Sequence, residues 1–263
     1  MILNEKKTPG LRWLYMLLAV SLIPACSGKP GDPREAINRM YDAYGGRENV
    51  ALLTSYTGKG YMKQLPTAGV AKSYPFDVYQ KDKLYKTVTY RLRRGELEDI
   101  QILAVNDDER LVWSRSGGFK TLPSWEVALQ RYRFPFVMTW LDGPGAGGER
   151  VVDEDSYGKY KIRYDLDEDI LTLVLDDSEW LLREIRLENS VDSTFLFREE
   201  YGDYRKVDGI PFPNRFTGFL AERKYYEYLI PAIELGAEMD EDLFRITAED
   251  TTQMMEAVKD TVR

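Results

Sequence analysis

From Ser55 onward the hydrophobic period of this chain is two residues, and very short turns separate the alternating segments. Turns such as Lys81-Asp82-Lys83 and Arg94-Gly95-Glu96 are too short for a parallel crossover, which needs about a dozen residues or more. Neighbouring segments must therefore pair antiparallel, and the pattern predicts one sheet of about ten to eleven strands. The expected strands are 56–63, 73–80, 84–93, 97–106, 110–114, 159–166, 170–175, 181–188, 194–205, 210–219 and 224–230.

Helices are expected before, within and after the strand series. Asp32 is suited to cap a first helix with Pro33 at its first position, and Gly45-Gly46 ends it. A short helix is expected at 48–53, and an amphipathic insert begins near Trp125 and Leu129. Further helices are expected at 137–141 and at 248–262, where Met255 faces inward. Because these helices are separate from the strands and do not alternate with them one by one, the pattern predicts an α+β fold.

The N-terminus reads as an export signal that ends in an acylation site. Lys6, Lys7 and Arg12 precede an apolar run of 13–23, which is too short to cross a bilayer that needs about 20 residues. The sequence Leu-Ile-Pro-Ala-Cys at 22–26 resembles the lipobox of bacterial lipoproteins. That resemblance implies a signal peptide at 1–25, lipidation of Cys26 and a tether at 26–32. An ordinary cleavage site or a buried thiol is the alternative.

Charge and composition exclude several functional classes. The whole chain carries −8, and removing a signal peptide of net charge +2 leaves about −10, which repels nucleic acids and anionic lipid surfaces. The chain has no histidine, so Ser-His-Asp and Cys-His catalytic groups are excluded. Cys26 is the only cysteine and has no internal disulfide partner.

Clusters of acidic residues are the remaining candidates for catalysis or metal binding. Asp165, Asp167 and Asp169 have the spacing of a calcium loop, but the positions that require Gly and Glu hold Ile170 and Asp176. Solvated hairpin turns are the preferred interpretation. A pair of carboxylates for glycoside hydrolysis has no recognisable motif. We therefore expect no enzyme, no catalytic residue, no metal and no cofactor.

Aromatic side chains dominate the apolar faces of the expected strands, and the chain has 18 tyrosines. Two interpretations stay open at this point. The aromatic side chains fill a core completely, or a broad curved sheet leaves an apolar cavity of the kind that binds small molecules.

Two C-terminal segments carry a resemblance to a known family. Residues 170–187 (ILTLVLDDSEWLLREIRL) describe two strands around an acidic turn, and 204–213 (YRKVDGIPFP) follows them. Together with Tyr41, Tyr44 and Gly45-Gly46 near the start, this order resembles the periplasmic lipoprotein-sorting family of the LolA/LolB type. The resemblance implies an incomplete antiparallel β-barrel with lid helices over an apolar concave face, formed by one domain at 33–263.

The resemblance also implies a function. We expect a lipid-anchored protein of the cell envelope, at the periplasmic face of the outer membrane, that binds acyl chains such as palmitate or other apolar ligands. The alternative is a non-catalytic interaction protein with a fully packed barrel and an unknown protein partner. An anchored protein cannot shuttle, so a holder or acceptor in lipid or lipoprotein sorting is favoured. The cavity candidates are Trp125, Leu129, Tyr160, Ile162, Tyr164, Phe195, Phe197, Phe216, Phe219 and Met255.

Overall fold

A computed structural model describes most of the chain from Asp32 to Ile246, a part that belongs to one compact unit. The described residues are 32–65, 71–94, 96–106, 110–114, 116–122, 127, 129–130, 132–141, 149–155, 159–166, 169–189 and 196–246, with only the backbone path given for 110 and 149–155. Cys26, Trp125, Phe195, Met255, the signal peptide and the C-terminal helix predicted at 248–262 lie outside them. No described helix is long and apolar enough to span a membrane.

In the described part of the chain, the helices with given bounds are α2 (Pro33–Ala43), α3 (Arg47–Leu53), α5 (Phe136–Trp140) and the 3-10 helix η1 (Glu241–Phe244). The Asp32 carboxylate accepts a hydrogen bond from the backbone N–H of Arg34 at 2.9 Å, as expected for a helix cap. Gly45 and Gly46 have φ values of +87° and +99°, a conformation that suits glycine and ends the helix.

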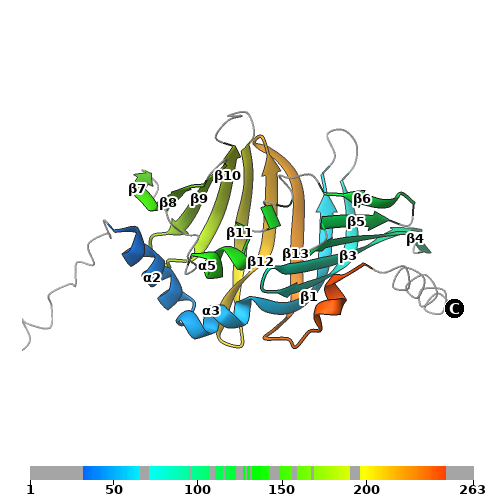
Figure 1. Ribbon diagram of the computed structural model, residues 1–263, viewed down its shortest axis with the longest axis horizontal. Coiled ribbons are helices and arrows are strands. Elements are labelled where there is room, and N and C mark those ends of the chain that lie inside the picture. The colour runs from blue at the N-terminus through cyan, green and yellow to red at the C-terminus, as the bar shows by residue number, and fades with distance from the viewer. Residues whose placement is uncertain are drawn as a thin grey trace, which may run out of the picture. The chain divides into compact units, whose positions relative to one another are not determined.

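The described strands form one open antiparallel sheet of thirteen strands (Figure 1). Their order is β6-β5-β4-β3-β2-β1-β13-β12-β11-β10-β9-β8-β7, with β6 and β7 at the two free edges. In chain order the strands are β1 (Ser55–Gln64), β2 (Lys72–Lys81), β3 (Leu84–Arg93), β4 (Glu96–Val105), β5 (Arg110–Ser114), β6 (Gly118–Thr121), β7 (Glu149–Asp155), β8 (Lys159–Asp165), β9 (Asp169–Asp176), β10 (Leu182–Asn189), β11 (Leu196–Val207), β12 (Ile210–Leu220) and β13 (Arg223–Leu235).

The predicted antiparallel architecture is confirmed, but the predicted strand count of ten to eleven is wrong for the described part of the chain. All eleven expected strands are present, and β6 and β7 are added at the edges. β6 was missed because all four of its residues are exposed, so no alternation marks it. β13 also continues past Ile230 to Leu235, where it pairs with the start of β1.

One face of the sheet, here called the inner face, packs against α2, α3 and α5. The Tyr41 hydroxyl on α2 donates to the Met138 carbonyl of α5 at 2.6 Å, and the Tyr44 and Tyr204 hydroxyls lie 3.1 Å apart. The helices thereby join to each other and to β11. Met40 of α2, Leu53 of α3 and Val137 of α5 are also fully buried in this core. Each such side chain contributes about 1.5–3 kcal/mol, which holds the helices on the sheet.

The opposite face of the sheet, the outer face, has its own small core at β3, β4 and β5. Val88, Ile102 and Trp113 lie side by side in this core, which also includes Ile246 beyond η1. The buried ammonium of Lys86 donates to the carbonyls of Leu243 and Arg245 at 2.6 and 3.2 Å. Where β3, β4 and β5 form the sheet, the outer face is therefore apolar, and polar residues such as Thr87 and Thr89 lie on the inner face.

Candidate functional site

The predicted cavity residues of β8, β11 and β12 lie in the packed core of the inner face. Tyr160, Ile162, Tyr164, Phe197 and Phe216 are all buried there. The ring centroids of Tyr164 and Trp140 of α5 are 5.4 Å apart, and those of Tyr160 and Trp180 are also 5.4 Å apart. These aromatic side chains therefore pack against helices and turns.

Two other candidates lie elsewhere. Phe219 is half-buried at the end of β12, where the guanidinium of Arg198 lies 4.0 Å from its ring centroid. Leu129 precedes α5 and lines a pocket in the part of the sheet that contains β3 and β4. Of the candidates that the structure describes, Leu129 is the one that meets this pocket.

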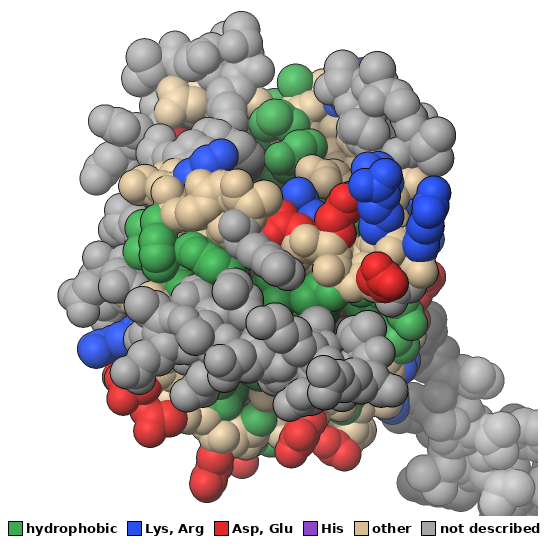
Figure 2. All heavy atoms as spheres, turned by 90° about the vertical axis from the view of Figure 1, so that its right-hand side faces the viewer, with side chains coloured by type: hydrophobic (Ala, Val, Ile, Leu, Met, Phe, Trp, Pro, Cys, Tyr) green, Lys and Arg blue, Asp and Glu red, His purple; other side chains and the backbone are tan. Residues whose placement is uncertain are grey.

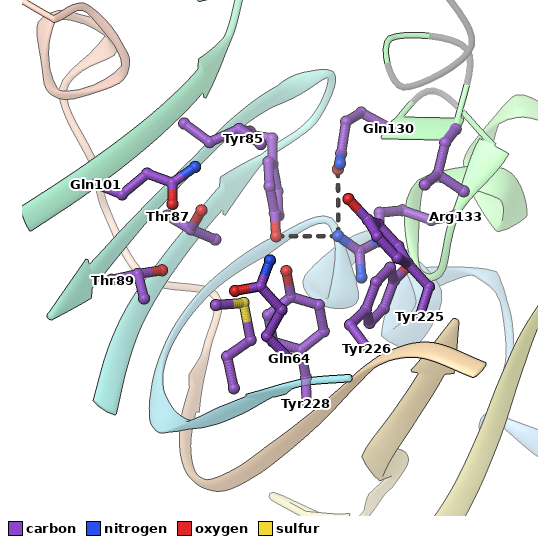
Figure 3. A pocket seen from close by; sticks show the side chains of 13 residues that line it. Gln64, Tyr85, Thr87, Thr89, Gln101, Gln130, Arg133, Tyr225, Tyr226 and Tyr228 are labelled. Atoms are coloured by element: carbon purple, nitrogen blue, oxygen red, sulfur yellow. Dashed lines mark hydrogen bonds between the residues drawn. The ribbon is translucent and has the colours of Figure 1, made fainter. Parts of the chain in front are cut away.

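The pocket has a volume of about 100 Å³ and lies between two walls of the inner face. Figure 3 shows Thr87, Thr89 and Gln101 on one wall and Gln130 and Arg133 across from them. The described residues that line it are Met62, Gln64, Tyr85, Thr87, Thr89, Gln101, Leu103, Leu129, Gln130, Arg133, Tyr225, Tyr226 and Tyr228.

Gln64 and Tyr225 are exposed, whereas Thr87, Thr89 and Leu129 are buried, so Gln64 and Tyr225 mark the mouth of the pocket. The backbone N–H of Leu65 donates to the Tyr225 carbonyl at 3.1 Å, which joins the two strand ends at this mouth. Figure 2, a view onto the right-hand side of Figure 1, shows hydrophobic side chains across the middle of the molecule and carboxylates at its lower edge.

A buried ion pair forms one end of the pocket. The Arg133 side chain is 7% exposed and Glu199 of β11 is 0% exposed, and Nη2 of Arg133 lies 2.8 Å from Oε1 of Glu199. Nη1 of Arg133 also donates to the Tyr85 hydroxyl at 3.0 Å and to Oε1 of Gln130 at 3.2 Å. Burying an unpaired charge would cost several kcal/mol, so each partner requires the other.

Tyrosines complete the coordination of Glu199. The hydroxyls of Tyr226 and Tyr201 donate to its two carboxylate oxygens at 2.5 and 2.9 Å. Burial, followed by the negative charge of Glu199, raises the pKa of both phenols well above the ordinary value. Burial alone would lower the pKa of the Arg133 guanidinium, but Glu199 and the surrounding phenols raise it well above its usual range. The Arg133 guanidinium thus stays charged at neutral pH, while the two phenols stay neutral.

This arrangement is suited to binding. The side chains of the pocket offer neutral hydrogen-bonding groups, aromatic faces and one guanidinium that is already paired. Among the described residues, no group of three His, Cys, Asp or Glu side chains could hold a metal ion. The acidic Asp165 pairs with the exposed Arg163 at 3.0 Å, as expected for a solvated turn, whereas Asp167 lies outside the described residues.

Few features of the sequence mark this pocket. Tyr85, Thr87 and Thr89 share one face of β3, but Lys86 alternates with them, so neither face of the strand appears clearly buried. Arg133 lies in a short aromatic run whose sequence resembles an exposed helix end. The available signal was the recurrence of Tyr85, Thr87 and Thr89 at every second position of β3, which marks a face that is polar and still suited to a strand.

Searches against protein-family models and against curated proteins found no match. Solved structures do share the fold. A LolA superfamily protein from Nitrosomonas europaea has a TM-score of 0.52 and 10% identity, with 81% of this chain and 97% of that chain covered. A DUF1329 family protein from Desulfovibrio piger has a TM-score of 0.51 and 9% identity, with 82% and 98% covered.

A third structure is described as an outer membrane lipoprotein-sorting protein domain, from Vibrio parahaemolyticus. It has a TM-score of 0.51 and 9% identity, and the alignment covers 84% of this chain and 99% of that chain. The predicted resemblance to LolA-like proteins is thereby confirmed at the level of the fold.

Proposed function

We propose that this chain, which has the fold of LolA superfamily proteins, is a non-enzymatic binding protein of the cell envelope. It holds a lipid-like amphiphile in the pocket between Thr87 and Arg133. The observation that carries the proposal is the pocket itself. It combines apolar and aromatic side chains, including Leu103, Leu129 and Tyr228, with hydrogen-bonding groups on the same walls. Such a lining fits a ligand with an apolar and a polar part.

The size of the pocket limits how the ligand is held. About 100 Å³ is well below the roughly 300–1,000 Å³ of typical small-molecule sites. A long acyl chain exceeds this volume, so one end of the ligand occupies the pocket and the remainder leaves past Gln64 and Tyr225. Each methylene that is buried on the way contributes about 0.8 kcal/mol.

The same proposal gives Cys26 its role. Acylation there would place the protein at the membrane surface, at the periplasmic face of the outer membrane. Stable anchoring requires more than a single acyl chain, and bacterial lipoprotein maturation supplies further chains. An anchored binding protein would hold or accept a lipid or the acyl chains of a lipoprotein.

The packing of the inner face favours a second candidate. Tyr160, Tyr164 and Phe197 are buried against neighbouring elements, which is the arrangement expected of an interaction protein whose barrel is filled. In that case the pocket carries no lipid, and a protein partner binds elsewhere.

Native mass spectrometry separates the two candidates. A form that begins at Ser27 retains the whole compact unit from Asp32 and lacks the acylated cysteine. We expect adducts of lipid mass and displacement of a fluorescent fatty acid by added lipid. A homogeneous ligand-free mass with no displacement would reject lipid binding, and a stoichiometric protein captured without lipid would support the interaction protein.

A further inference from the structure

The pocket is lined by polar side chains on one strand of the sheet. Thr87 and Thr89 are both 5% exposed and line the pocket from neighbouring positions on one face of β3. Neither threonine hydroxyl belongs to the enclosed side-chain atoms that lack a hydrogen-bond partner in the described part of the chain. Since both threonines line the pocket, their hydroxyls can donate to or accept from a molecule inside it.

The electrostatics of the pocket restrict the charge of such a molecule. Among the lining residues that the structure describes, Arg133 is the one with a charged side chain, and it is already bound to Glu199, Tyr85 and Gln130. Since Glu199 neutralises it at 2.8 Å, the pocket offers no net positive charge to a carboxylate or a phosphate. An anionic group would lose its hydration without gaining a counter-ion.

The other polar groups of the described lining are neutral and can donate or accept hydrogen bonds. Gln101 of β4 lies directly opposite Thr89 and lines the pocket. Its Oε1 accepts a hydrogen bond from Arg91 at 3.0 Å, which leaves its amide N–H groups to donate to a ligand. Figure 3 shows Gln101, Thr87 and Thr89 on one wall of the pocket. Their amide and hydroxyl groups can form hydrogen bonds with the hydroxyl and ester oxygens of a ligand.

We propose that the pocket selects an amphiphile with a neutral, hydroxyl-bearing head group, such as a glycerol ester, over one with a free carboxylate or phosphate. This inference rests on the proposed function and names the ligand class for the same site. The head group lies against Thr87, Thr89 and Gln101, and the acyl chain leaves between Gln64 and Tyr225.

The test compares ligands that share one chain length. Isothermal titration of the form beginning at Ser27 is carried out at neutral pH with 1-decanoylglycerol, decanoate, decyl phosphate and glycerol. We expect 1-decanoylglycerol to bind about tenfold more tightly than either anion, because two neutral hydrogen bonds each contribute about threefold or more. Glycerol alone is expected to bind far more weakly, because it lacks the acyl chain.

Substitutions assign the preference to the threonines. Thr87→Val with Thr89→Val removes both hydroxyls, keeps the side-chain shape and should remove the preference while changing decanoate affinity less than about twofold. The Thr87→Ser and Thr89→Ser pair keeps the hydroxyls and should keep the preference. Thr57→Val is the matched control, because Thr57 belongs to the same sheet and does not line this pocket.

The outcomes separate this inference from the proposed function. Equal or tighter binding of decanoate, with no effect of the valine pair, would overturn the head-group preference and leave lipid binding intact. Absence of binding by all four compounds would overturn both. Glycerol binding as tightly as its ester would identify a free polyol ligand and reject the lipid.

Discussion

Replacing Glu199 with glutamine tests the buried ion pair that closes one end of the pocket. Glu199 is fully buried and accepts hydrogen bonds from Arg133, Tyr226 and Tyr201. Glutamine removes the negative charge and turns an N–H group toward one of these donors. Breaking a buried pair by removing one partner costs about 3–5 kcal/mol, so Glu199→Gln should lower the free energy of unfolding by that amount.

Urea unfolding followed by tryptophan fluorescence and circular dichroism measures this change. The midpoint should fall while the slope with urea stays constant, because the change acts on stability and not on the exposed area. Arg133→Met with Glu199→Gln should be more stable than Glu199→Gln alone, since no unpaired charge remains. Glu98→Gln is the control, because the Arg93–Glu98 pair is exposed and should contribute at most about 1 kcal/mol.

A loss below about 1 kcal/mol for Glu199→Gln would refute the reasoning. It would mean that water or an anion compensates the charge of Arg133, so that Glu199 is not its main counter-ion.

Three further predictions concern the phenols, the core and the anchor. The raised pKa values of Tyr201 and Tyr226 contribute stability that is complete below about pH 10 and is lost above it, because the unfolded chain then releases protons that the folded chain keeps. Phenolate absorbance should therefore rise with unfolding, and titration of all tyrosines near pH 10 in the folded protein would contradict this. Phe212→Ala empties a fully buried position of the inner face and should cost about 3–5 kcal/mol in urea unfolding, and a cost below about 1 kcal/mol would contradict the packed core. Cys26→Ala should abolish incorporation of labelled palmitate and release the protein from membranes, and label that persists would reject the anchor.

The alternation of residues predicted the sheet well because the second strand series has one dry face. Tyr160, Ile162 and Tyr164 are buried on one face of β8, whereas Lys159 and Arg163 on the other face are exposed. Because the turns are very short, consecutive strands could pair only in antiparallel orientation. β6 lies at a free edge with all residues exposed, so it offers no buried face that a pattern could reveal.

The candidate site was not predictable in the same way. Aromatic residues mark burial, but the sequence does not say whether a helix or a ligand covers them. Here α5 covers Tyr164 through Trp140, and the pocket lies where the inner face carries Thr87 and Thr89. Arg133 reaches Glu199 across 66 positions of sequence, a contact that only the folded sheet creates.

Photo-crosslinking measures most directly whether this pocket is the ligand site. The form beginning at Ser27 is irradiated with a decanoylglycerol that carries a diazirine on its acyl chain, and the labelled residues are identified by peptide mass spectrometry. We predict labels on Met62, Leu103 or Tyr225, which unlabelled 1-decanoylglycerol suppresses. Labels confined to α2 and α3, or labelling that competitor does not reduce, would contradict the assignment of this pocket as a lipid-binding site.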